Sequence, residues 1–325
     1  MLRFILRRLF WAIPVLIAAS IIVFAAVRAT TDPVAAAERN PHTTPAALAK
    51  YKHDLGLDKS APEQYGIWLK KFVHGDWGTS LHSNLPVWPQ IRTALVNSLV
   101  LGLLATFFAI MIGLTVGIIS ALKQYSVFDH ASTGISFFLL SFPPFLFGLI
   151  VIILFGTFYE QHLHRTAPLL PLAGIYSPGH SGFDLTDRAR HLILPGIVLA
   201  VQVIAYYSRY MRTSMLETIN SDYLRTARSK GISEKRVIIR HALRNALIPI
   251  TTFAALDIGA IAGGLIITEK LFEYPGMGAF FLDSYANSDY TQILPWMMVV
   301  VAFVIFFNLL ADLSYAWLDP RIRLD

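Results

Sequence analysis

Long apolar runs alternate with shorter polar segments along the whole chain. Each run holds about the 20 apolar residues that an α-helix needs to cross the hydrocarbon core of a bilayer. The pattern therefore predicts an all-α, polytopic membrane protein with six transmembrane helices. Their expected bounds are Leu9–Val27, Ala94–Leu122, Ala131–Tyr159, Leu192–Met211, Ala246–Thr268 and Ile293–Trp317.

One long segment outside these runs, residues 30–93, separates the first two predicted spans. It is rich in proline and tryptophan, and its lysines and acidic residues nearly balance. Two stretches within it, Pro45–Leu55 and Pro62–Phe72, are expected to be helical. The chain thus divides into an N-terminal span (1–29), a small extracytoplasmic lobe (30–93) and a five-helix transmembrane domain (94–325).

Basic residues indicate which side of the membrane each polar segment occupies. Three arginines precede the first span, a long basic run follows the fourth, and Arg321 and Arg323 lie near the end of the chain. Lys and Arg are retained on the cytoplasmic side, whereas long loops cross the membrane largely regardless of charge. We therefore expect a multi-pass membrane protein with both termini in the cytoplasm and the lobe outside.

The composition agrees with this interpretation. Hydrophobic residues make up 55% of the 325 residues and charged residues 15%, whereas soluble domains carry about 25% charged residues. The net charge of +6 reflects basic residues retained inside, so it does not indicate nucleic-acid binding. The sequence has no cysteine, no Gly-Lys phosphate loop, and no H-E-x-x-H or G-x-S-x-G motif. We expect no catalytic residue, metal or cofactor; the pair His162 and His164 lacks a third ligand.

Several spans contain residues that are unusual inside a bilayer. Pro143 and Pro144 interrupt the third span and are expected to bend or break it, which is tolerated only against protein or a water-filled cavity. Gly113 and Gly117 form a G-x-x-x-G pattern that lets another helix approach closely. Asp257 lies near the middle of the fifth span, where an acid either lines a transport pathway or pairs with a neighbouring helix.

Two further polar features lie near the ends of spans. Asp312, close to the inner end of the sixth span, is expected to pair with Arg209 or Arg212. The segment Glu269 to Gly278, between the fifth and sixth spans, contains a Pro275-Gly276 turn. This segment either closes the outer mouth of a pathway or only joins two spans, and the sequence leaves both possibilities open.

The basic run extends from Asp222 to Thr252. We expect one helix over Met215–Lys230, a turn at Gly231, an N-cap at Ser233 and a second helix over Glu234–Leu247 that leads into the fifth span. A polybasic segment could simply lie on anionic lipid, where each Lys or Arg contributes about 1 kcal/mol. That role needs only charge. The two helices with a glycine between them instead favour docking into a groove of a partner protein.

The same run carries a recognisable motif. Arg225-Thr226-Ala227 is followed three residues later by Gly231, and the segment HALRNALIP begins at His241. This register resembles the EAA loop of the membrane-spanning subunits of bacterial ABC importers, in their dipeptide, oligopeptide and nickel branch. The Glu and first Ala of the general motif are Arg and Thr here, similar to the RTARxKG form of that branch.

The resemblance covers nearly the whole chain. Further matching motifs are LGLD from Leu55, GDxGxS from Gly75, HxxLP from His191, RxxRxSM from Arg209 and ExxFxxPGMG from Glu269. The long outer lobe is similar to that of the first of the two homologous permeases of such a transporter. One departure is Thr-Thr-Asp-Pro after the first span, where the family has Pro-Gly-Asp-Pro.

The resemblance implies a permease subunit that moves peptides across the bacterial plasma membrane by alternating access, without being an enzyme itself. Its expected partners are a second homologous permease, two cytoplasmic ATPase subunits that bind ATP and Mg, an external solute-binding protein and the lipid bilayer. A cytoplasmic loop, residues 213–247, would couple it to the ATPases. The coupling residues would be Arg225, Thr226, Ala227, Arg228, Lys230, Gly231, Ile232, Ser233 and His241.

Two more sites are expected from the residues themselves. Asp257 with Pro143 and Pro144 would line the translocation pathway. The outer gate would consist of Glu269, Phe272, Pro275 and Gly276. The alternative to an ABC permease is a secondary transporter, or a membrane scaffold, that acts without an ATPase. A secondary transporter more often shows inverted repeats and several intramembrane charges, which this sequence does not show.

Overall fold

The computed structural model describes residues 2–30, 34, 44–54, 56–159, 168–179 and 182–318. Within these ranges the chain is helical, with no strand. Its α-helices are α1 (Leu2–Thr30), α3 (Pro45–Asp54), α4 (Ala61–Val73), α5 (Val87–Leu122), α6 (Val127–Ser141), α7 (Pro144–Ile153), α9 (Leu185–Ile219), α10 (Asp222–Ser229), α11 (Glu234–Arg236), α12 (Leu243–Ile261), α13 (Ile266–Leu271), α14 (Met277–Ala286) and α15 (Tyr290–Leu318). Two π-helical segments are η1 (Leu154–Phe158) and η2 (Val237–Ala242).

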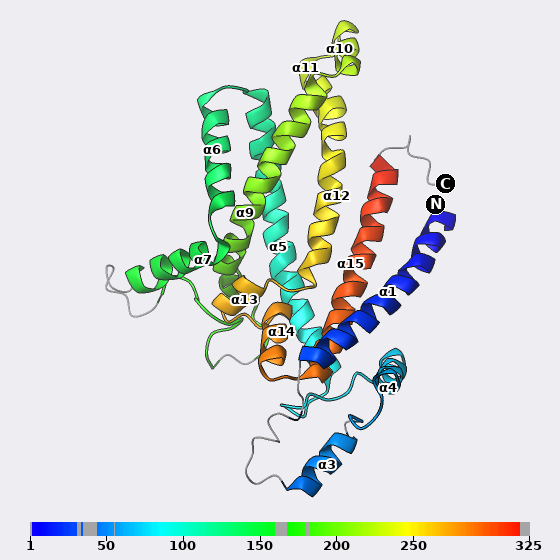
Figure 1. Cartoon of the computed structure of the whole chain (residues 1–325). Helices are drawn as coiled ribbons and strands as arrows, with labels where there is room; N and C mark the ends of the chain where they lie inside the picture. The colour runs from blue at the N-terminus through cyan, green and yellow to red at the C-terminus, as the bar shows by residue number, and fades with distance from the viewer. Residues whose placement is uncertain are drawn as a thin grey trace.

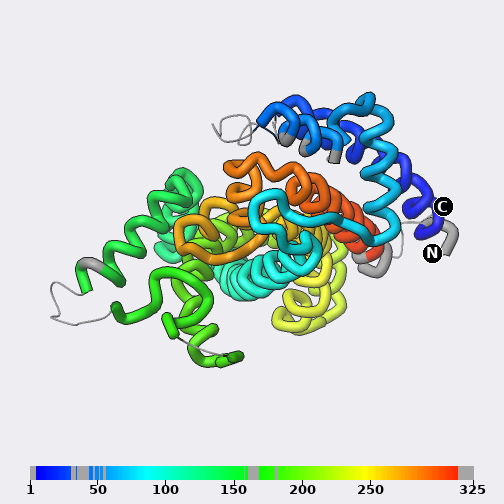
Figure 2. Tube along the Cα trace, turned by 90° about the horizontal axis from the view of Figure 1, so that it is seen from below, coloured from blue at the N-terminus to red at the C-terminus, as the bar shows by residue number. Residues whose placement is uncertain are grey.

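The long helices stand side by side, and the short ones gather at the two ends of this bundle (Figure 1). Helices α10 and α11 lie at one end, whereas α3, α4, α13 and α14 lie at the other. Seen along the bundle, α1 and the lobe occupy one flank and α6 and α7 the opposite flank (Figure 2). Helix α9 is central to the bundle, because it packs against α5, α6, α7 and α12.

Four helices are long and apolar enough to cross a membrane: α1, α5, α9 and α15. The broken pair α6 and α7 is a fifth candidate. The fifth predicted span corresponds to α12, a helix of 19 residues that includes the polar Arg244, Asn245 and Asp257. The structure therefore supports an all-helical membrane protein with at least four candidate spans.

The third predicted span breaks where the double proline lies, as expected. Helices α6 and α7 are bent by 98° at Phe142 and Pro143. Proline has no N–H, so carbonyl groups of the preceding turn lose their helical partners. Gln202 of α9 replaces one of them by donating its side-chain N–H to the carbonyl of Phe142 at 2.9 Å. The break is thus held by protein, as a membrane environment requires.

The close approach predicted at the two glycines of α5 is confirmed. A Cβ on Gly113 would lie 2.9 Å from the Cβ of Tyr207, and one on Gly117 would lie 2.5 Å from the carbonyl of Ser208. Neither contact is possible for a larger residue without displacement of α9. The G-x-x-x-G pattern therefore sets the packing distance between α5 and α9.

The two helices expected in the lobe are present as α3 and α4. A chain of aromatic contacts joins α4 to the bundle, with ring centroids 5.4 Å apart for Trp68 and Phe72, 4.9 Å for Phe72 and Trp77, and 4.6 Å for Trp77 and Trp88. Trp88 already belongs to α5, which begins at Val87. The second span therefore starts seven residues before the predicted Ala94.

The fifth predicted span is too long at its C-terminal end. Helix α12 ends at Ile261, and Gly264 with φ +86° turns the chain before α13 begins. A Cβ on Gly264 would lie 2.0 Å from the amide nitrogen of Gly278. Apolar residues continue through this turn into α13, so hydrophobicity alone could not place the end of the helix.

Some expectations fall outside the described residues. The pair His162 and His164 lies within residues 160–167, and the basic C-terminus with Arg321 and Arg323 lies within residues 319–325.

Candidate coupling loop and transport site

The glycine of the basic run closes helix α10 with a Schellman turn. Gly231 has φ +75°, the left-handed conformation that glycine adopts without a steric penalty. Its N–H donates to the carbonyl of Arg228 at 2.9 Å, and the N–H of Ile232 reaches back to the carbonyl of Ala227 at 3.4 Å. These two bonds satisfy carbonyls that the end of a helix leaves free.

An ion pair spans the same turn. The guanidinium of Arg228 donates from Nε to Oε2 of Glu234 at 3.0 Å and from Nη2 to Oε1 at 2.9 Å. This hydrogen bond lowers the pKa of Glu234 below its ordinary value. The contribution of the pair is therefore present above the ordinary Glu pKa and is lost as the pH falls through the lowered one. The turn is thus fixed by backbone and side chain together.

The helix expected over Met215–Lys230 is two helices in the structure. Helix α9 ends at Ile219, and α10 starts after Ser221, whose hydroxyl donates to the carbonyl of Thr218 at 2.6 Å. Residues that bond their own backbone in this way favour breaks between helices. The first part of the predicted loop 213–247 therefore belongs to α9.

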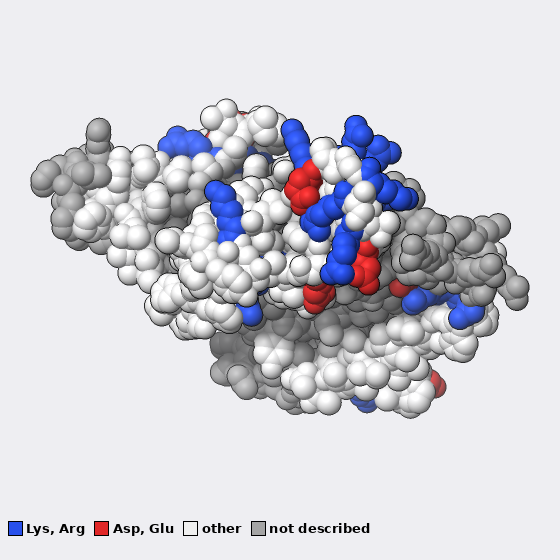
Figure 3. Space-filling model, turned by 90° about the horizontal axis from the view of Figure 1, so that it is seen from above, with Lys and Arg blue, Asp and Glu red and all other residues white. Residues whose placement is uncertain are grey.

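The loop is fastened to the bundle by apolar contacts on one side. Leu224 of α10 and Val237 of η2 are fully buried against Met211 and Met215 of α9. The opposite side carries exposed basic side chains, which gather over the α10 end of the molecule (Figure 3). These are Arg225, Lys230, Lys235, Arg236, Arg240 and Arg244.

The other predicted coupling residues lie on the same loop. Thr226 is exposed, with its hydroxyl bonded to the carbonyl of Asp222 at 3.1 Å. Ser233 stands at the N-cap of α11, but its side chain makes no capping bond. His241 is half-buried in η2, which continues into α12. The predicted continuity between the second loop helix and the fifth span is thereby confirmed.

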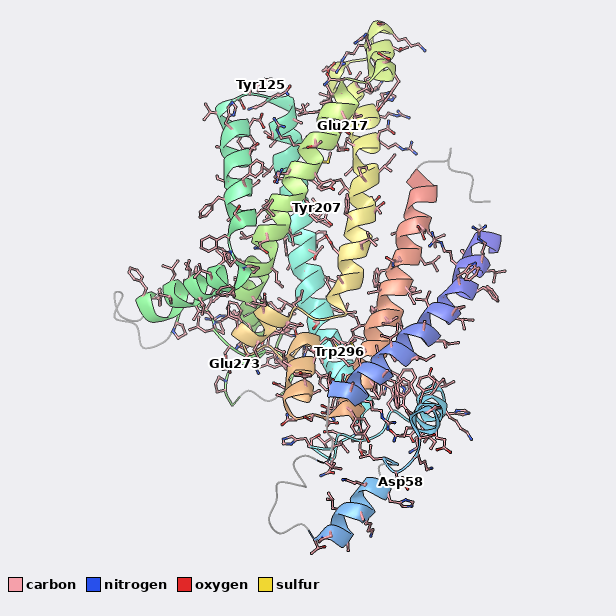
Figure 4. The ribbon with its side chains drawn as sticks, viewed as in Figure 1. Asp58, Tyr125, Tyr207, Glu217, Glu273 and Trp296 are labelled. Carbon is pink, nitrogen blue, oxygen red and sulfur yellow. The ribbon has the colours of Figure 1, made fainter. Side chains whose placement is uncertain are left out.

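A buried ion pair below this loop was not predicted. Arg212 of α9 donates from Nε to Oδ1 of Asp129 at 2.6 Å and from Nη2 to Oδ2 at 2.8 Å. Asp129 also accepts from the hydroxyl of Ser120 and, at 2.9 Å, from the N–H of Tyr125. Tyr125 marks the α5–α6 turn in Figure 4. The carboxylate of Asp129, 2% exposed, thus ties this turn to α9.

The expected partner of Asp312 is therefore wrong. Arg212 is occupied by Asp129, and Arg209 lies over the ring of Phe137. Asp312 instead pairs with Arg8 of α1 at 2.8 Å. Helices α1 and α15 pack against each other, which brings the two residues into contact although they are far apart in sequence.

Removal of one partner of the buried pair should destabilise the protein strongly. Arg212→Gln leaves the carboxylate of Asp129 buried without its cation, a loss of about 3 kcal/mol in the free energy of unfolding. Arg8→Gln removes an arginine from an ion pair whose side chains are 52% and 31% exposed, and should cost at most about 1 kcal/mol. Thermal unfolding of both variants in one detergent measures the difference, and equal midpoints would contradict the prediction.

The residues expected in the pathway lie on two sides of α9. Asp257 of α12 accepts a hydrogen bond from the hydroxyl of Tyr207 at 2.6 Å. Tyr207 is fully buried, whereas Asp257 is exposed on the surface of the single chain. Pro143 and Pro144 lie at the α6–α7 break, against α9 through Gln202. The structure connects these residues through α9 and shows no contact between Asp257 and the prolines in the part of the chain that it describes.

The expected gate residues surround one buried carboxylate. Glu269 of α13 is fully buried. Its Oε2 accepts from the N–H groups of Gly278 at 2.7 Å and Ala279 at 3.1 Å, and its Oε1 from Ser98 at 2.5 Å and the N–H of Leu265 at 3.1 Å. The first N–H groups of a helix have no intrahelical partner. Glu269 thus caps the N-terminus of α14, where a negative charge is favourable.

The remaining gate residues fit around this carboxylate. A Cβ on Gly276 would lie 2.3 Å from Cδ of Glu269, so only glycine fits there. The carbonyl of Pro275 accepts from Asn97 of α5 at 2.9 Å. Phe272 is buried in the cluster with Leu194 and Val198 of α9. The segment is therefore a packed structure joined to α5 and α9.

Comparison with known proteins identifies the family. Residues 113–324 match the family described as "Binding-protein-dependent transport system inner membrane component", and residues 1–115 match its N-terminal region. The chain belongs to this family. Among the relatives of this transport-system component, the dipeptide transport system permease protein DppB of Escherichia coli strain K12 is 36% identical, covering 99% of both chains.

Two further relatives of this inner membrane component are similar along their whole length. The oligopeptide transport system permease protein AppB of Bacillus subtilis strain 168 is 37% identical, covering 99% of this chain and all of the relative. The di/tripeptide transport system permease protein DppB of Pseudomonas aeruginosa is 37% identical, covering 99% of both. The match therefore includes the lobe with α3 and α4 as well as the helical bundle.

Several residues that organise these sites gave only weak signals in the sequence. Ser126 followed by Asp129 is a helix-start pattern, but nothing indicated Arg212 as the partner. Ser98 and Asn97 sit in a uniformly apolar stretch, where a polar pair could have indicated contact with another element. Tyr207 lacked any such signal, because tyrosines are common in membrane helices.

Proposed function

We propose that this chain is the transmembrane permease subunit of an ATP-driven ABC importer that carries peptides across the bacterial plasma membrane. The observation that carries the proposal is its similarity, over 99% of its length, to relatives named as dipeptide, di/tripeptide and oligopeptide permeases. The helical bundle and the basic loop at one end are consistent with it.

The proposed assembly contains a second homologous permease, two ATPase subunits that bind ATP and Mg, and an external solute-binding protein. The chain crosses the bilayer six times, with α12 as the fifth span and α6–α7 as the third. The basic end with α10 and both termini face the cytoplasm, because Lys and Arg are retained there. The lobe with α3 and α4, together with α13 and α14, faces outside.

The proposed mechanism is alternating access. The ATPases engage the loop around Gly231, whose glycine turn and Arg228–Glu234 pair give it a fixed shape. Because η2 continues into α12 and α10 packs on α9, a movement of the loop is passed directly to two helices of the bundle. The peptide crosses between the two permeases while the segment from Glu269 to Gly276 acts at the outer gate.

The test is purification and reconstitution. The chain, tagged and expressed in its own host, should co-purify with an ATPase and a second permease. Proteoliposomes that contain the complex should accumulate a radiolabelled dipeptide only when ATP and the solute-binding protein are present. Uptake driven by an ion gradient without any ATPase would contradict the proposal and favour a secondary transporter.

A further inference from the structure

A pocket with a partly polar lining opens on α9 in the half of the bundle nearest α10. Its volume is about 430 Å³, within the range of about 300–1,000 Å³ that ligand pockets occupy. Pro249 of α12 and Leu140 of α6 form two of its walls. In Figure 4, Tyr207 and Glu217 mark the two ends of the stretch of α9 that carries it. The polar lining residues on α9 are Tyr206, Arg209, Tyr210, Thr213, Ser214 and Glu217.

The cation in this pocket is the guanidinium of Arg209, and one of its faces is stacked on an aromatic ring. The guanidinium carbon of Arg209 lies 3.9 Å from the centroid of the Phe137 ring on α6. Stacking of this kind fixes the plane of a guanidinium but leaves the N–H groups at its edge available. In the described residues Arg209 forms no ion pair, unlike its neighbour Arg212. Arg209 can therefore donate two parallel N–H hydrogen bonds, the geometry that matches the two oxygens of a carboxylate.

The wall beside Arg209 is aromatic and tightly packed. The rings of Tyr206 and Tyr210 have centroids 4.9 Å apart, and Tyr210 lies 4.5 Å from Phe253 of α12. Tyrosines offer apolar surface together with a hydroxyl that can donate or accept. Such a wall can contact varied side chains and still bond to peptide groups, without selecting one side chain.

One acidic group lines the pocket with this cation, and a second lies on α12 outside the lining. Glu217 lines the pocket and is exposed. Asp257, exposed on α12, uses Oδ2 to accept from Tyr207. Charged groups of both signs are expensive in a membrane-spanning region unless they meet a partner. A zwitterionic ligand supplies both partners at once.

We propose that this pocket binds the peptide during its passage, with the guanidinium of Arg209 receiving the C-terminal carboxylate. The inference rests on the proposed function and extends it, because it assigns recognition of a free carboxyl terminus to the permease. Glu217 repels a second carboxylate and attracts the α-ammonium group of the peptide. The aromatic wall accommodates the side chains between the two ends.

The experiment compares a dipeptide with its C-terminal amide. Complexes that contain wild-type chain, Arg209→Gln or Arg209→Lys are reconstituted with the same partner subunits and the same solute-binding protein. ATP-dependent uptake of alanyl-alanine and alanyl-alanine amide is measured for each. Selection by the solute-binding protein is identical in all complexes, so it cancels when the acid-to-amide ratios are compared.

Arg209→Gln should lower the acid-to-amide ratio about tenfold, since a charge-assisted bond to carboxylate is lost. Arg209→Lys keeps the positive charge but not the two parallel N–H donors. Its acid-to-amide ratio should therefore lie between those of the wild type and Arg209→Gln. Arg190→Gln is the matched control: Arg190 is exposed on the same helix at its outer end, and its loss should leave the ratio unchanged.

Two results would overturn the inference. An unchanged acid-to-amide ratio in Arg209→Gln would show that Arg209 does not bind the carboxylate. Dissociation of the Arg209→Gln complex on gel filtration would instead place Arg209 at the interface with an acidic group of the second permease. Failure of the proposed function is a separate result, because then the wild-type complex itself would show no ATP-dependent uptake of either peptide.

Discussion

Gly231→Val should reduce ATP-driven peptide uptake at least about tenfold while leaving membrane insertion intact. An added Cβ would meet nothing within 4 Å, so steric contact at this atom is not the cause of the effect. The cost arises in the backbone: φ +75° is penalised by roughly 1–2 kcal/mol for L-residues and more for β-branched ones. The Schellman turn would relax, and the angle between α10 and the helix leading to α12 would change.

The measurements are uptake in proteoliposomes and ATPase activity stimulated by the loaded solute-binding protein. Gly231→Asn is the matched control, because Asn tolerates the left-handed region and should retain most of both activities. Normal substrate-stimulated ATPase activity in Gly231→Val would refute a coupling role for this turn.

Glu269→Gln should lower the free energy of unfolding by about 3 kcal/mol. The carboxylate accepts four hydrogen bonds inside the protein. An amide replaces one acceptor oxygen by an NH₂ group, which faces donors and leaves a buried N–H without a partner. The negative charge at the N-terminus of α14 is lost as well. The segment between α12 and α14 should then open to limited proteolysis before the bundle unfolds.

Glu273→Gln provides the same substitution four residues later. Glu273 is exposed, and Figure 4 shows it pointing away from the bundle. A surface substitution of this kind changes the free energy of unfolding by less than about 0.5 kcal/mol. Thermal unfolding and protease sensitivity of the two variants, measured side by side, would refute the assignment if both behaved like wild type.

Patterns that act within one helix could be predicted from the sequence. The break at Pro143 follows from the missing N–H groups, and the close contact at Gly113 and Gly117 follows from their missing side chains. The turn at Gly231 was predicted for a similar reason. In each case the residue type limits its own backbone or its own surface, whatever the neighbouring helix is.

Pairings between distant helices could not be predicted in this way. The sequence suggested Arg209 or Arg212 as the partner of Asp312, and only the packing of α1 on α15 brings Arg8 to it instead. Nothing in the sequence links Asp129 to Arg212, and only the packing of α6 on α9 brings the two residues together. The end of α12 was missed because apolar residues continue into α13, so no change in hydropathy marks the turn at Gly264.

The C-terminal part of α9, after Pro195, has a mechanical consequence. After Pro195 the helix contains no proline up to Ile219, a length of roughly 36 Å at 1.5 Å per residue. Three elements are attached along this stretch. The α5–α6 hairpin is held at Arg212, helix α12 is held at Tyr207, and α10 packs against Met215. A tilt of this helix would therefore move all three attached elements together. A tilt of about ten degrees would displace one end of such a rod by ~6 Å relative to the other, more than one helical turn.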